Sequence, residues 1–172
     1  MKWIDKNVDL GLLILRIGVG GLMFLHGFHK IFNGIGMIEG QVTGMGLPAF
    51  FAYGVYIGEV VAPLLILLGL GTRAASAILA VNCVVAMLMV HAKDIFSLTP
   101  QGGWGVELLG LYLFGAIALM FTGGGKYAVS HKHLRDRQLK DKSRGNIPNI
   151  EKPLDLLYFF HYFYSFLKEK LR

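Results

Sequence analysis

The chain has 172 residues, of which 54% are hydrophobic and only 16% are charged, so it is more apolar than an ordinary soluble domain. Most basic residues follow residue 125, so the net charge of +6 belongs to the C-terminal tail. This distribution favours anionic lipid headgroups over nucleic acid, for which no recognition motif is present. Cys83 is the only cysteine, which excludes an intramolecular disulfide and a dithiol relay on one chain.

The first apolar run covers residues 10–32 and follows a polar N-terminus, residues 1–9. At ~1.5 Å per residue it is long enough to cross a bilayer core of about 30 Å. It carries Arg16 in its first third and His26, His29 and Lys30 at its far end. Four of its glycines, Gly11, Gly18, Gly20 and Gly21, would let a neighbouring helix come close.

Three further spans are predicted at residues 49–70, 74–92 and 104–122. The glycine-rich segment 33–48 is expected to be a loop. In the second span Pro63 cannot donate a hydrogen bond to the carbonyl of Glu59, so we expect a kink and a free acceptor there. The predicted fold is therefore all-α, a transmembrane four-helix bundle with a membrane domain at residues 10–125.

The C-terminal region divides into a basic linker, residues 126–152, and an aromatic segment, residues 153–172. The aromatic segment is too short to span, and we expect an amphipathic helix at the membrane interface. An even number of spans places both termini on one side. The N-terminus, Arg73 and residues 126–144 hold ten Lys or Arg, whereas the opposite loops and span ends hold two. The positive-inside rule then predicts a multi-pass protein of the plasma (inner) membrane with cytoplasmic termini.

Two charged residues within the spans, Arg16 and Glu59, are predicted to form a buried ion pair. Arg16 lies ~9 Å inside one end of the first span, and Glu59 lies ~15 Å from the opposite end of the second. In a core about 30 Å thick their heights differ by roughly 6 Å, which an extended arginine can bridge. The pair could have a functional role, or it could have only the structural role of holding the two helices together.

A second polar group is expected in the outer third of the membrane, where His26, Lys30, His91 and Glu107 lie at similar depth. Helical phase favours His26 over His29 as the inward-facing side chain. His91 and Glu107 are expected to be hydrogen-bonded, because they lie at the adjacent ends of two spans that a short loop joins. Imidazole beside carboxylate is suited to handling protons during quinone turnover, so His26, His91 and Glu107 are the candidate catalytic residues.

These polar residues could also be present without any catalytic role. Histidine and glutamate at span ends are often only wetted by interfacial water. A metal site built from His26, Glu59, His91 and Glu107 lacks a ligand-spacing motif, and a haem held by two of these histidines has no better support, so no metal is predicted. Asn82 and His91 are nine residues apart and lie on opposite helix faces, so they cannot both contact one small ligand.

Several short motifs together resemble the DoxX family of small four-span membrane proteins. They are Leu15 to Gly20, Leu25 to Phe32, Gly46 to Pro48, Gly58 with Glu59, Leu67 to Arg73, His91, Gly102 to Trp104 with Glu107, and Thr122 with Gly123. The resemblance covers about residues 10–127. It implies a four-helix bundle in the plasma membrane and a link to quinone oxidation and other oxidoreductase systems.

We therefore expect a quinone-interacting subunit or helper of a membrane redox system, with the lipid bilayer and a soluble redox partner at the cytoplasmic tail as its partners. The alternative is a non-catalytic scaffold that recruits a soluble partner or anionic lipid through that tail. A small-solute transporter is less favoured, because four short spans leave little room for alternating access. The sequence leaves open whether the chain is itself an enzyme and whether it forms a homo-oligomer.

Overall fold

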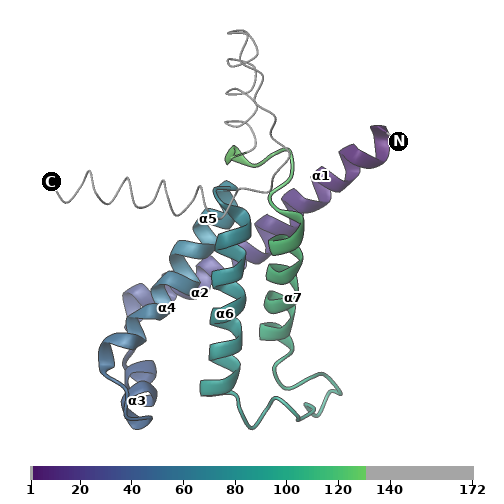
Figure 1. Ribbon diagram of the computed structural model, residues 1–172. Helices are drawn as coiled ribbons and strands as arrows, with labels where there is room; N and C mark the ends of the chain where they lie inside the picture. The colour runs from purple at the N-terminus through teal and green to yellow at the C-terminus, as the bar shows by residue number, and fades with distance from the viewer. Residues whose placement is uncertain (1, 131–172) are drawn as a thin grey trace, which may run out of the picture.

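The computed structural model describes residues 2–130, and within them the named elements are all helices (Figure 1). A single isolated bridge joins Leu98 and Trp104 in the loop between the last two helices. The predicted all-α class with long apolar helices is therefore confirmed. The predicted interfacial helix at residues 153–172 lies outside the described residues.

The first span is one long helical segment that begins earlier than expected. It consists of α1 (Lys2–Arg16), a π-helical turn η1 (Ile17–Gly21) and α2 (Leu22–Asn33). Residues 2–9 contain neither glycine nor proline, so nothing in them interrupts the helix. The segment 33–48 is not simply a loop, because it contains the short helix α3 (Gly36–Gly44). Gly34 and Gly46, with φ of +80° and +78°, reverse the chain on either side of α3.

The second span contains four consecutive pieces: η2 (Ala49–Tyr53), α4 (Gly54–Tyr56), the π-helical η3 (Ile57–Val61) and α5 (Ala62–Leu68). The remaining long helices are α6 (Thr72–Val90) and α7 (Glu107–Thr122). Three segments are long and apolar enough to cross a membrane: Asn7–Asn33, Ala49–Leu68 and Thr72–Val90. The 16 residues of α7 cover only about 24 Å, so a fourth crossing stays a prediction.

The helical segments begin and end at two opposite sides of the protein, which are called here the Arg16 end and the Lys30 end (Figure 1). At the Arg16 end lie the N-terminal half of α1, the end of α5 and residues 123–130. At the Lys30 end lie α3 and the loop between α6 and α7. The predicted linker begins as packed structure, because Ala128 is buried and the Ser130 N–H donates to the Gly69 carbonyl, 3.2 Å away. The rest of that linker lies outside the described residues.

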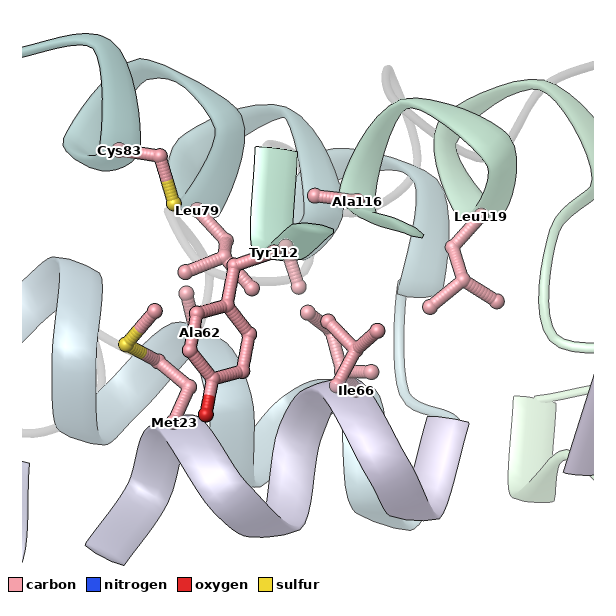
Figure 2. Close-up of a cluster of buried hydrophobic side chains, with 10 residues drawn as sticks. Met23, Ala62, Ile66, Leu79, Cys83, Tyr112, Ala116 and Leu119 are labelled. Atoms are coloured by element: carbon pink, nitrogen blue, oxygen red, sulfur yellow. The ribbon is translucent and has the colours of Figure 1, made fainter. Parts of the chain in front are cut away.

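The main core lies between the four long helical segments, and small residues let them approach (Figure 2). Figure 2 shows Tyr112 of α7 reaching in among Met23, Ala62 and Leu79, which come from the three other segments. Ala62, Ala75 and Ala116 are almost completely buried, so helix backbones meet with little side chain between them. The core contains Val19, Met23, Ala62, Ile66, Ala75, Leu79, Cys83, Tyr112, Ala116 and Leu119.

The first and second spans cross at glycines and at π-helical turns. A Cβ added to Gly20 would lie 3.0 Å from the Pro63 carbonyl, and one added to Gly27 would overlap the Glu59 carbonyl. Pro63 cannot donate to that Glu59 carbonyl, and the Ala62 N–H bonds instead to Ile57, five residues back. The break expected at Pro63 therefore takes the form of a π-helical turn whose Glu59 backbone is covered by Gly27. A Cβ added to Gly11 or Gly18 would meet no atom of another segment within 4 Å, so no helix comes close at these two glycines.

Arg16 does not pair with Glu59, and the predicted ion pair between them is wrong. The guanidinium is 1% exposed and donates three hydrogen bonds to backbone carbonyls: Ile66 at 2.9 Å, Leu67 at 2.7 Å and Gly124 at 3.1 Å. The carbonyls of Ile66 and Leu67 belong to the last turn of α5, which carries negative dipole charge, and the Ile66 carbonyl also accepts a hydrogen bond of 3.1 Å from the Gly69 N–H. Arg16 thus joins α1, the end of α5 and the turn after α7.

The predicted pair fails because a carboxylate is not the only partner that satisfies a buried arginine. Five N–H donors in a fixed plane can satisfy several carbonyls at once, so a helix C-terminus serves equally well. Asp9 strengthens the same junction, because its Oδ1 accepts a hydrogen bond of 2.9 Å from the Lys126 N–H.

Replacing Arg16 tests this junction. Arg16→Gln should lower the free energy of unfolding by about 2–4 kcal/mol, because it leaves buried carbonyls without donors. Arg16→Lys should be nearly as damaging, since one ammonium cannot reach three carbonyls in a fixed arrangement. Denaturant unfolding in detergent measures both, and a lysine variant as stable as wild type would show that charge alone suffices.

Replacing Gly27 tests the helix crossing. Gly27→Ala should destabilise the protein by about 1–3 kcal/mol, because the added methyl overlaps the Glu59 carbonyl and must separate the helices. Gly11→Ala is the matched control, since open space surrounds Gly11 and alanine favours the helix by about 0.5–1 kcal/mol. Equal unfolding midpoints for the two variants in the same detergent would contradict the crossing.

Candidate functional site

Lys30 and Glu59 form an ion pair at the crossing of the first and second spans. The Lys30 Nζ lies 2.5 Å from Oε1 and 2.6 Å from Oε2 of Glu59, so the ammonium bridges both carboxylate oxygens. Glu59 is 6% exposed, whereas the Lys30 side chain is 30% exposed. A charge so buried in an apolar protein is stable only when paired, and Lys30 supplies the partner.

Local structure explains why these two side chains meet. Gly27 lies one helical turn before Lys30 on the same face of α2, so the helices come closest next to the lysine. Glu59 lies in the middle of η3, opposite Gly27. Tyr56 donates a hydrogen bond of 3.3 Å from its hydroxyl to the Lys30 carbonyl and adds a second link between the two spans.

The ion pair forms part of the wall of a cavity of about 330 Å³. Residues of α2, α3, the second span and α6 line it. Four of them are polar: Lys30, Gln41, Glu59 and Asn82. The other lining residues are Ile38, Val42, Phe51, Ala52, Gly54, Val55, Ile57, Gly58, Ile78, Val81, Val85, Ala86, Met89 and Val90.

Asn82 contributes an uncommitted amide to this cavity. It packs against Gly58, where an added Cβ would overlap its side chain, so the glycine makes room for it beside Glu59. Among the side-chain hydrogen bonds of residues 2–130, none involves the Asn82 amide. Gln41, from α3, is also incompletely satisfied, because its Oε1 is buried without a hydrogen-bond partner.

This arrangement is suited to a flat apolar molecule that carries oxygen acceptors. The Lys30 ammonium has a third hydrogen beyond the two carboxylate oxygens, and the Asn82 amide adds two N–H donors. Apolar walls with a few convergent polar groups are the usual composition of a small-molecule site.

The three residues expected to handle protons do not gather at one place. The His26 ring lies edge-on to Tyr112, with centroids 6.0 Å apart, on the side of α2 that meets α7. The Nδ1 of His91 lies 3.1 Å from Oδ2 of Asp94, so the expected hydrogen bond from His91 to Glu107 is replaced by a local contact. Glu107 is exposed at the first turn of α7, where its charge favours the helix dipole.

These positions correct the expected outer group. His91 directly follows the last residue of α6, and its ring contacts Asp94, three residues further along in the loop. The His26 ring contacts Tyr112 of α7, but His26 and His29 are both exposed, so the inward-facing position expected for His26 is not observed. Within residues 2–130, His, Cys, Asp and Glu form no group of three that could hold a metal ion.

Sequence reasoning missed the pairing of Lys30 with Glu59, although two signals for it are present. Gly27 and Lys30 share one helix face, and Gly58 precedes Glu59, so each charge lies next to a position of close approach. The sequence shows Asn82 as a polar residue within a span. Its position on the helix indicates that it faces away from His91, but it does not indicate which residue it contacts. Nothing in the sequence singles out Gln41, because its place depends on the fold of α3.

Comparison with known proteins agrees with this membrane fold. Residues 11–92 match the DoxX family. The chain is 30% identical over 146 residues to a Bacillus subtilis (strain 168) protein named "Putative oxidoreductase CatD", which covers 83% of this chain and 98% of the relative. It is 32% identical over 138 residues to a Haemophilus influenzae protein described as "Uncharacterized protein", which covers 78% of this chain and 99% of the relative. No solved structure matches. The chain is therefore a membrane protein of the DoxX family.

Proposed function

We propose that this protein binds a quinone in the cavity beside Lys30 and Glu59, as a subunit or helper of a membrane redox system. The observation that carries the proposal is a buried ion pair and a free amide in the wall of an otherwise apolar cavity. The name of the Bacillus subtilis relative supports the redox connection. Lys30 and Asn82 take the ligand-facing role that the sequence pattern suggests for His26, His91 and Glu107.

Lys30 is the central group of this proposal. Its ammonium donates to one ring oxygen of the quinone while Glu59 holds it in place. Reduction of a quinone takes two electrons and two protons, and negative charge develops on the ring oxygens. A cation preorganised at such an oxygen stabilises that charge and can pass a proton to it. Water then restores the ammonium, whose side chain is 30% exposed, and supplies the second proton to the other ring oxygen.

The two electrons come from a redox partner in this proposal. A soluble partner held by the cytoplasmic tail lies across the membrane from the Lys30 end, so it acts on quinone that has diffused to its own face. We place the protein in the plasma membrane with both termini cytoplasmic, so that the Lys30 end faces outward. Residues 131–172, which would recruit the partner, lie outside the described residues. A protein that bound no quinone would leave the scaffold role, with the same tail, as the remaining proposal.

The test is quinone affinity of the purified protein in detergent. Decylubiquinone should bind, and Asn82→Leu should weaken it about three- to tenfold, because one net hydrogen bond is worth about 0.5–1.5 kcal/mol. Lys30→Met combined with Glu59→Gln should weaken it further, and the double change avoids leaving an unpaired buried charge.

Lys93→Met is the control, because it removes an exposed lysine that does not line the cavity. It should leave the affinity unchanged. Absence of quinone binding by wild type would refute the proposal. So would loss of binding in His91→Ala together with full binding in Asn82→Leu.

A further inference from the structure

The cavity has one side formed by side chains that are also exposed on the outside of the protein. Ile57 of η3 is 54% exposed and Val81 of α6 is 63% exposed, yet both line the cavity. Val85, one turn further along α6, lines it as well and is 45% exposed. The cavity therefore opens to the surroundings between η3 and α6.

The lining residues of α6 form a single continuous stripe. They recur at helical spacing from residue 78 to residue 90, over about 18 Å: Ile78, Val81, Asn82, Val85, Ala86, Met89 and Val90. Asn82 is the only polar side chain in this stripe. A groove of this length exceeds what one quinone ring fills, and it has apolar surface left for a chain attached to the ring.

The Lys30 end of the cavity is covered by a second apolar cluster. Ile35 and Val42 from the α3 region pack with Ala52 of η2, and Met89 of α6 packs against them. The cover is partial, because Phe51 and Val90, which also line the cavity, are 55% and 38% exposed. The opening at Ile57 and Val81 lies on the flank of two helical segments that are long and apolar enough to cross the membrane.

We infer that the ligand enters sideways from the lipid through a portal between Ile57 and Val81, and that an apolar tail on the ligand stays in this portal. The inference rests on the proposed quinone site. The ring passes to Lys30 and Asn82, and the tail lies along the α6 stripe and continues into the hydrocarbon. The selected substrate class is a quinone with a long alkyl or isoprenoid tail.

The experiment compares two probes that share one head group, decylubiquinone and its tail-free parent 2,3-dimethoxy-5-methyl-1,4-benzoquinone. Val81→Trp fills the portal with a large side chain. Val84→Trp is the matched control, because Val84 is a 41% exposed valine of the same helix that does not line the cavity. Affinities are measured for the full-length protein in the same detergent.

Val81→Trp should weaken decylubiquinone about tenfold or more and leave the tail-free probe within about twofold of wild type, while Val84→Trp changes neither. If Val81→Trp weakens both probes equally or neither, the portal is wrong although the quinone site stands. If wild type binds neither probe, the quinone site fails, and the portal with it.

Discussion

The ion pair between Lys30 and Glu59 joins the first two membrane segments and also forms part of the cavity wall. A carboxylate buried to this degree requires a cation at contact distance, so the two helices must cross where the lysine can reach it. Gly27 permits that crossing by bringing α2 against the Glu59 backbone. The π-helical turn η3, which Pro63 favours, carries Glu59 at the point of contact. Glycine, proline and the two charges therefore act as one unit.

The two ends of the protein use buried cations in different ways. At the Arg16 end the guanidinium is almost completely buried and donates to three carbonyls, which holds α1, α5 and the turn after α7 together. At the Lys30 end the ammonium is only partly buried and lines a cavity. The difference follows from chemistry, since a planar guanidinium suits a fixed set of acceptors and an ammonium keeps a donor free. One end is built for stability and the other can accept a small molecule.

Much of the fold could be predicted from the sequence, because apolar length and helix-breaking residues are local signals. The long helices and the break before Pro63 both follow from them. The partners of the charges could not be predicted in the same way. Depth arithmetic assumes straight helices that start at one plane, whereas the second span begins with the 3-10 turn η2 under the additional helix α3. Glu59 therefore lies next to Lys30. Arg16 donates to backbone carbonyls, which a prediction based on opposite charges does not consider.

A double-mutant cycle on Lys30 and Glu59 tests the central claim most directly. Unfolding free energies in one detergent are compared for wild type, Lys30→Met, Glu59→Gln and the double variant. We predict that Lys30→Met costs about 3–5 kcal/mol, because it leaves a buried carboxylate unpaired, and that the double variant is clearly more stable than the sum of the single losses implies. Strictly additive losses would show that the two side chains do not interact, and would contradict this account of the crossing and of the cavity.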